Sequence, residues 1–265
     1  MTRKSIQHTI FPLLFFVLFF SGVNNVEAQN LPFSKGERLK YNIYYQWGII
    51  WKKAAEATLT AQETTYRSNK AYQLRLSART TPFFDNFLHV RDTLISITSL
   101  DLLPLYYAKI THEGSYNGVE DLAYSYDSGK ISTRARTFRD KELRVDSTFV
   151  HNVSSIFDML SVFYHIRSMD IARMNKNQVT PLTIVSGSKT FKIKVVYSGV
   201  TSIETPDDKT YETYKITIVL ESLKKNKVVK EEMQFWMSKD EQKLPILLSA
   251  KLPLGTLKAY FQGVE

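Results

Sequence analysis

Residues 154–173, SSIFDMLSVFYHIRSMDIAR, are the one stretch with a clear helical pattern in a chain of 265 residues that otherwise carries strand signals. Its apolar residues recur at helical spacing and also fill most remaining faces: Ile156, Phe157, Met159, Leu160, Val162, Phe163, Tyr164 and Ile166. Ser155 and Asp158 form a candidate capping pair for the first turn. A helix that is apolar nearly all round must be covered, so we predict that it is buried.

The rest of the chain alternates apolar and polar residues with a period of two, which is typical of half-buried antiparallel strands. The clearest runs are residues 39–47, 55–61, 72–78, 191–197 and 214–220. Turn sequences separate successive runs at 127–130, 186–188 and 224–227. We therefore predict a mainly β fold of about a dozen strands. It is a large curled antiparallel sheet or half-open barrel, with one buried central helix over residues 154–173.

The first 28 residues have the pattern of an export signal. Arg3 and Lys4 precede an apolar run over residues 11–20, and small residues lead up to Ala28. The run is too short to span a bilayer, which needs roughly 20 apolar residues, and no later stretch comes close. We predict cleavage after Ala28, leaving a mature chain without a transmembrane span that is soluble in the periplasm or otherwise outside the inner membrane.

The mature chain is basic and lacks cysteine. Removal of Arg3, Lys4 and Glu27 lowers the net charge from +9 to +8. The surplus is either lysine on solvated strand faces or an attraction to an anionic envelope component such as lipid or polysaccharide. Nucleic acid is not expected as a partner, because no recognition motif is present. Without cysteine, a cysteine-linked lipid anchor, disulfides and thiolate metal sites are excluded.

We expect residues 29–265 to form a single β domain, whose oligomeric state the sequence leaves open. Two segments within it are similar: Ser99 to Ile110 and Ser238 to Leu252 each contain a polar turn and a Leu-Pro pair that starts the next strand. One interpretation is two similar halves flanking the helix. The other is a coincidence of common turn residues.

Residues spread along the chain carry a family resemblance. They are Phe33, Gly36, Glu37, Leu39, Tyr41, Ile43, Pro104, Asp158, Leu160, Tyr164, Arg167, Trp236, Ser238, Asp240 and Pro245. As a set they resemble the uncharacterised bacterial family DUF3108 over residues 33 to 262. The resemblance implies an exported, mostly antiparallel β domain and supplies no established activity. The outline is also similar to periplasmic lipoprotein carriers, half-open barrels that hold acyl chains around helical plugs, by analogy of architecture alone.

Motifs of known catalytic chemistry are absent. The sequence contains no Gly-x-Ser-x-Gly elbow, no phosphate-binding Gly-rich loop and no His-Glu-x-x-His helix. His89, His112, His151 and His165 follow no ligand spacing, and we expect His165 and Asp158 to be a core histidine and a cap. We therefore predict no catalytic residue, no metal and no cofactor. A hydrolase site assembled from distant strands is the remaining enzymatic alternative.

Aromatic residues outside the strand period are the candidate ligand-binding residues. Phe83, Phe84 and Phe87 follow Pro82 between two alternating runs, and Trp47 lies beside Gly48. They either fold under the sheet as a lid or project as an apolar lip; we expect the lid, because large exposed apolar patches are uncommon. Trp51 poses the same choice, and Trp236 is expected in the core.

Phe163 and Arg167 on the predicted helix complete the candidate set. Arg167 either pairs with a strand carboxylate, which we favour, or reaches the anionic group of a ligand. The sequence thus predicts an exported, non-enzymatic envelope protein that binds a lipid or other apolar or amphiphilic ligand between the curled sheet and the helix. The alternative is a closed structural or interaction protein whose basic faces, at Arg134 and Arg136 or at Lys192 and Lys194, meet a partner.

Overall fold

The computed structural model describes residues 31, 33–224 and 227–265. The predicted signal peptide, residues 1–28, therefore lies outside the described residues, and the turn predicted at 224–227 is described only at its two ends. Within the described ranges no helix is long and apolar enough to cross a membrane.

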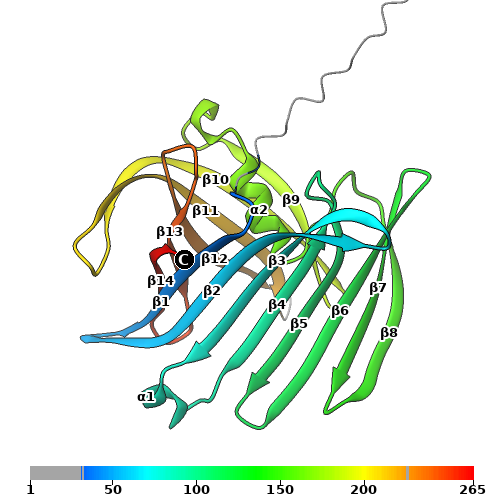
Figure 1. Cartoon of the computed structure of the whole chain (residues 1–265), viewed down its shortest axis with the longest axis horizontal. Helices are drawn as coiled ribbons and strands as arrows, with labels where there is room; N and C mark the ends of the chain where they lie inside the picture. The colour runs from blue at the N-terminus through cyan, green and yellow to red at the C-terminus, as the bar shows by residue number, and fades with distance from the viewer. Residues whose placement is uncertain (1–30, 32, 225–226) are drawn as a thin grey trace, which may run out of the picture.

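Fourteen strands make up a single antiparallel sheet in the described part of the chain (Figure 1). The first group comprises β1 (Glu37–Trp47), β2 (Ile50–Tyr66), β3 (Asn69–Thr80), β4 (Arg91–Thr98), β5 (Pro104–Glu113), β6 (Tyr116–Asp127), β7 (Lys130–Arg139) and β8 (Glu142–His151). The second comprises β9 (Val179–Ser186), β10 (Lys189–Glu204), β11 (Thr210–Lys224), β12 (Lys227–Ser238), β13 (Pro245–Lys251) and β14 (Thr256–Val264). There are also three short helical segments: α1 (Pro82–Asp85) lies between β3 and β4, and α2 (Ser161–Ser168) and the 3-10 helix η1 (Ile171–Arg173) lie between the two groups.

The strand order is β8-β7-β6-β5-β4-β3-β2-β1-β14-β13-β12-β11-β10-β9. The chain builds the sheet outward from β1 to β8, crosses to the opposite edge, and returns as a second meander until β14 pairs with β1. Figure 1 shows the sheet curled around α2, with its two edge strands not paired to each other. The predicted curled antiparallel sheet with a buried helix is confirmed.

The helix is shorter than predicted, and this part of the sequence interpretation was wrong. Only residues 161–168 are α-helical; residues 154–160 are irregular or extended. Phe157 pairs with β9, because its N–H donates to the Thr183 carbonyl at 2.9 Å and its carbonyl accepts from the Val185 N–H at 2.8 Å. A backbone whose hydrogen bonds are satisfied by a strand has no reason to become helical.

The cap also differs from the predicted pair, since Asp158 works with Ser161 and not with Ser155. The Asp158 carboxylate accepts from the backbone N–H groups of Leu160 and Ser161, each at 2.8 Å, and the Ser161 hydroxyl accepts from the Asp158 N–H at 3.0 Å. This reciprocal pair satisfies the free donors of the first turn. The cap therefore fixes the start of the helix just after Phe157, the residue that pairs with β9.

The α2 segment divides the interior into two apolar cores. Ile156, Leu160 and Tyr164 pack in a core built mainly from β1 to β7, with Ile246 of β13 and Phe261 of β14. Phe157, Val162, Ile166 and Ile171 pack against the half built from β9 to β13. Phe163 contacts both cores, and its ring lies 4.6 Å from that of Phe235. The predicted role of the helix in covering an apolar sheet face is thus confirmed.

The two Leu-Pro loops have the same hydrogen bonding. In the first, the Ser99 N–H donates to the Leu103 carbonyl at 2.8 Å, and the Leu103 N–H donates to the Ser99 hydroxyl at 3.2 Å. In the second, Ser238 and Leu244 exchange the equivalent bonds at 2.8 and 2.7 Å. The two loops thus close with the same pair of bonds, although the bonded residues are four positions apart in the first loop and six in the second, so whether they are an internal repeat stays a prediction.

Candidate functional site

The inner face of the sheet changes from closed to open along the strands. On β1, Leu39 and Tyr41 are buried beside α2, whereas Ile43 on the same face is partly exposed. The same change occurs on five further strands, from buried Leu74, Ser96, Phe235, Ile246 and Phe261 to partly exposed Leu76, Leu94, Met233, Leu248 and Ala259. We call the six partly exposed side chains, from Ile43 to Ala259, the inner open set. Among the described residues, the helix covers one end of the inner face, and the inner open set lies beyond it, partly buried against the two cores.

Three neighbouring loops lie at the end of the sheet beyond the inner open set. They are the β1–β2 turn at residues 48–49, the β3–β4 loop at 81–90 and the β13–β14 loop at 252–255. Strand pairing brings them together, because Ala55 is opposite Thr80 and Gln46 is opposite Thr256. We call this the loop end. Figure 1 shows the β1–β2 hairpin and α1 projecting from the same side of the sheet.

Large apolar side chains are exposed on these loops and form what we call the apolar rim. They are Trp47 (54%), Ile49 (103%), Ile50, Trp51, Phe83, Phe87 (75%), Leu88 and Leu254 (67%). The prediction that Phe83, Phe84 and Phe87 fold under the sheet as a lid was wrong, since only Phe84 is partly buried. Phe83 and Phe87 project as an apolar lip, because the loop extends beyond the last strand pair and no other element of the described residues covers it.

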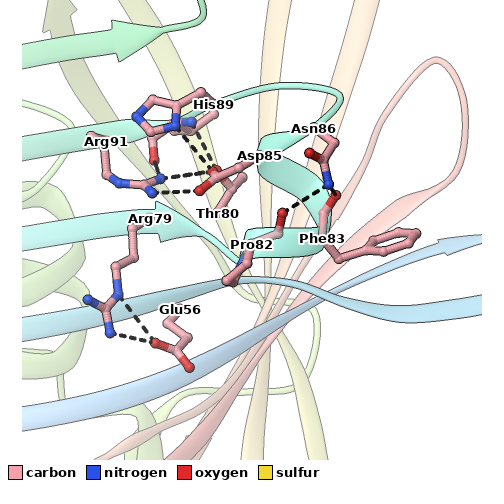
Figure 2. Close-up of polar contacts among 10 residues, drawn as sticks. Glu56, Arg79, Thr80, Pro82, Phe83, Asp85, Asn86, His89 and Arg91 are labelled. Carbon is pink, nitrogen blue, oxygen red and sulfur yellow. Dashed lines mark hydrogen bonds and ion pairs between the residues drawn. The ribbon is translucent and has the colours of Figure 1, made fainter.

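A network of polar side chains lies on the side of the β3–β4 loop that faces away from the Phe83 ring, and it fixes the conformation of the loop (Figure 2). Asp85 accepts from both terminal nitrogens of Arg91, at 3.0 and 2.7 Å, and from the Thr80 hydroxyl. The Thr80 hydroxyl in turn accepts from the Val90 N–H at 3.0 Å. The Arg91 guanidinium and the Thr80 hydroxyl lower the pKa of Asp85 to about 2, so its carboxylate stays charged. Figure 2 shows the Phe83 ring directed away from this network.

The rings of the loop form a compact cluster beside a cation. The Phe83 ring lies 5.5 Å from each of the rings of Phe84 and Phe87. The Lys52 ammonium lies 4.8 Å from the centre of the Phe83 ring, a cation–π contact. Lys52 is opposite Tyr45 on β1, so it lies on the face of the hairpin that continues the inner open set. The loop end therefore combines an apolar surface with a positive charge at its inner margin.

The β1–β2 hairpin and the β13–β14 loop support each other. The Tyr45 hydroxyl donates to the Leu254 carbonyl at 2.8 Å. Gly255 has φ +85°, and a Cβ at this position would lie 2.3 Å from the Gln46 carbonyl oxygen, so the close approach requires glycine. Trp51 stacks on Tyr44 at 4.9 Å, with the Lys258 ammonium 5.4 Å from its ring.

The structure does not bring the six predicted ligand residues together. Trp47, Phe83, Phe84 and Phe87 are at the loop end, whereas Phe163 and Arg167 are on α2, next to the opposite end of β1. Arg167 bonds to Glu37, and β1 runs for 11 residues from Glu37 to Trp47. At about 3.3 Å per residue, this places the two groups about 30 Å apart.

Arg167 pairs with a strand carboxylate, as we favoured from the sequence. Its guanidinium is fully buried and donates to both carboxylate oxygens of Glu37, at 2.7 and 3.0 Å, and to the carbonyls of Gln242 and Lys243. All three nitrogens of the guanidinium group thus have acceptors within the protein. This arrangement ties α2 to β1 and to the β12–β13 loop.

Asp158 and His165 are held by contacts within the protein core. Burial raises the pKa of the Asp158 carboxyl, and its hydrogen bonds to Ser161, Ser96 and Leu160 lower it in part. The His165 ring stacks on Phe157 at 4.4 Å, and burial lowers its pKa. Trp236 is buried, which confirms the expected core position. Across residues 31, 33–224 and 227–265, no three His, Asp or Glu side chains gather in a way that could hold a metal ion.

The Arg134 and Arg136 face carries its own counter-charges. Arg134 pairs with Asp146 at 2.6 Å and Arg136 with Asp121 at 2.8 Å, each through two hydrogen bonds.

A cleft of about 580 Å³ lies at the helix end of β1, between Phe33, Glu37, Gln242 and Leu244. A second cleft, of about 560 Å³, is lined mainly by polar groups such as Lys40, Glu56 and Arg79. The predicted ligand residues line neither of these two clefts.

The sequence interpretation missed several residues of the loop end. Ile49, Ile50, Leu88, Leu254 and Lys52 were not singled out, although they surround the predicted aromatic residues. One signal was available, since a run of four apolar residues interrupted only by Gly48, WGIIW, is unusual for an exposed hairpin turn. The Leu254 contribution depends on the pairing of β14 with β1, which no local pattern reveals.

Fold and site together define an open antiparallel β-sheet curled around a short helix, with apolar loops at the uncovered end. The chain belongs to the family described as Protein of unknown function (DUF3108), whose model matches residues 40–262. No curated protein matches the sequence.

Among the solved structures that match this chain are two that cover most of its length. A β-barrel-like protein of the domain of unknown function DUF1849, from Brucella abortus, has a TM-score of 0.57 at 8% identity, covering 88% of this chain and 98% of that one. This similarity concerns the fold alone. A protein from Bacteroides fragilis described as exported, with a YmcC-like fold, has a TM-score of 0.39 at 7% identity, covering 89% of this chain and 98% of that one.

Proposed function

We propose that this protein is an exported, non-enzymatic envelope protein that binds a lipid-like amphiphile at the loop end of its sheet. The observation that carries the proposal is the inner open set, which leads from the helix-covered core to the apolar rim. These six side chains pack against the two cores and are only partly buried, and an apolar surface that the protein itself leaves partly exposed is a place where another apolar molecule can bind. The basic charge of the mature chain and the signal-like N-terminus support an envelope location.

The apolar part of the ligand would lie along the inner open set, with Phe84 and Trp47 at its margin. Apolar and aromatic side chains with a few polar groups are the usual lining of ligand sites. The anionic group would meet Lys52, whose ammonium is at the inner margin of the loop end. Lys52 suits this role better than Arg167, because the Arg167 donors are taken by Glu37 and two carbonyls.

Titration with an environment-sensitive fluorescent fatty acid, dansyl-undecanoic acid, tests this proposal. We expect saturable binding by the wild type and at least about tenfold weaker binding by Phe84→Asp, since burying an apolar side chain contributes about 1.5–3 kcal/mol. Leu100→Asp is the matched control, because Leu100 is an exposed leucine in the β4–β5 loop, beyond the opposite end of β4. It should bind like the wild type.

Lys52→Glu separates the charge from the apolar contact. This variant should weaken binding of the fatty acid but leave binding of its uncharged methyl ester unchanged. Circular dichroism confirms that each variant is folded. Absence of saturable binding by the wild type would favour the closed structural protein instead.

A further inference from the structure

We propose that the apolar rim docks the protein on an anionic lipid bilayer, with the β1–β2 turn and the β3–β4 loop inserted at the level of the lipid head groups. This inference rests on the proposed function, because the docked face is the mouth of the amphiphile site. It adds a partner, the membrane surface, from which the amphiphile would be taken or to which it would be given.

The first argument is the shape and chemistry of the rim. Its side chains come from turns at the tip of the sheet: Ile49 is fully exposed, and Phe87 and Leu254 are exposed by two thirds or more. Trp, Phe, Ile and Leu on a protruding surface are the residues that enter the boundary between head groups and acyl chains. A loose cluster of this kind would fold back on the protein, but the Asp85–Arg91–Thr80 network and the Tyr45–Leu254 bond hold these loops in place.

The second argument is the charge around the rim. Residues 46–56, 79–91 and 251–258 carry the cations Lys52, Lys53, Arg79, Arg91, Lys251 and Lys258, against the carboxylates Glu56 and Asp85. Glu56 pairs with Lys53 and Arg79, and Asp85 pairs with Arg91. Lys52 and Lys258 lie over the rings of Phe83 and Trp51. Cations directly behind an apolar tip match a surface with anionic head groups above an apolar layer.

The protein contains its own reporters for the test. It has three tryptophans. Trp47 and Trp51 belong to the rim, whereas Trp236 is buried with Leu247 and Tyr260, and Trp51 contacts this cluster through its ring packing on Tyr44 and Tyr260. Lipids brominated on their acyl chains quench only tryptophans that reach the bilayer.

The experiment uses the full mature chain and vesicles of phosphatidylglycerol and phosphatidylcholine, with pure phosphatidylcholine for comparison. We expect co-sedimentation with the anionic vesicles and quenching by brominated lipid in the wild type. The double variant Trp47→Phe, Trp51→Phe retains only Trp236, so the fraction of it that sediments with the vesicles should not be quenched. Ile49→Asp and Phe87→Asp should bind at least tenfold more weakly, and Leu100→Asp should bind like the wild type.

The charge is tested by Lys258→Glu. Its affinity for the anionic vesicles should fall about fivefold or more at low salt, and by less at high salt.

Two outcomes would overturn the inference: no binding to anionic vesicles by the folded wild type, or binding that Ile49→Asp and Phe87→Asp leave unchanged. The dansyl-undecanoic acid titration keeps the two proposals separate. Uptake of the free fatty acid without vesicle binding would leave the proposed function in place and refute membrane docking. Vesicle binding without uptake of the fatty acid would refute the amphiphile site while supporting the docking surface.

Discussion

Asp158 shows how a single buried side chain can fix the path of the chain. Its carboxylate accepts from two backbone N–H groups of the first turn of α2 and from the Ser96 hydroxyl on β4. Burial penalises the charged form and raises the pKa of the carboxyl, while these hydrogen bonds oppose the rise. The same group therefore begins the helix and attaches it to the sheet.

Replacement of Asp158 by alanine should destabilise the fold by about 1–3 kcal/mol, because the donors of Leu160, Ser161 and Ser96 would be left buried without acceptors. Urea unfolding followed by circular dichroism measures the change. Asp158→Asn is the matched control. Its amide oxygen keeps an acceptor at the cap, so its free energy of unfolding should fall by less than that of the alanine variant. Wild-type stability in the alanine variant would mean that the cap is not needed.

α2 is a short helix that depends on its contacts more than on its own propensity. It has only eight residues, which is too few to be stable alone in water. Its position comes from the cap at one end, two apolar cores along its length and the Glu37–Arg167 pair. Each of these contacts can be removed separately.

Leu160→Ala should cost about 2–5 kcal/mol, from lost burial and the cavity left between the helix and the β1–β7 half of the sheet. Met159 is the neighbouring residue and is exposed, so Met159→Ala should stay within about half a kcal/mol of the wild type. Denaturant unfolding of both variants checks this. Equal small losses would show that α2 is peripheral to the core.

The Glu37–Arg167 pair should give a strong coupling in a double-mutant cycle. Arg167→Met alone leaves the Glu37 carboxylate buried without its partner and should cost about 3–5 kcal/mol. Adding Glu37→Gln removes that charge, so the double variant should lose less than the sum of the two single variants. Additive losses, measured by urea unfolding, would contradict a direct coupling between α2 and β1.

The curled sheet is held across its open seam by side chains. His151, at the end of β8, bonds to Thr133 on β7 at 2.7 Å and to Thr190 on β10 at 3.3 Å. Glu120 on β6 accepts from the Gly187 N–H in the β9–β10 turn at 2.6 Å. These contacts connect the two meanders where their strands do not pair.

The seam should make stability depend on pH. Burial lowers the pKa of His151 below its ordinary value of 6.5, so the unfolded chain takes up the proton first as the pH falls. Stability should therefore decrease as the pH falls through the ordinary pKa of 6.5 towards the lower pKa of His151 in the folded protein, and His151→Gln should reduce this decrease. Part of this loss of stability at low pH should remain in the His151→Gln variant, because burial also lowers the pKa of His165. Identical pH profiles in unfolding experiments would exclude a contribution of His151.

Alternating residues were sufficient to predict the strands, their antiparallel pairing with chain neighbours and the presence of a covered helix. Each of these follows from a local pattern, because a period of two assigns the residues of a strand to two faces and a short turn joins adjacent strands. The runs around Leu39, Leu74 and Ile216 became β1, β3 and β11, and each of the three leucine or isoleucine side chains is fully buried.

The length of the helix and the position of the aromatic residues depended on contacts between distant parts of the chain. Residues 154–160 have a helical pattern, yet Phe157 pairs with β9, a partner far enough along the sequence that no local signal identifies it. Phe83 and Phe87 have the composition of a lid, yet they project, because the sheet ends beneath them and no other described element reaches that far. A sequence pattern specifies which side chains avoid water, but whether a neighbour is present to cover them is a property of the assembled fold.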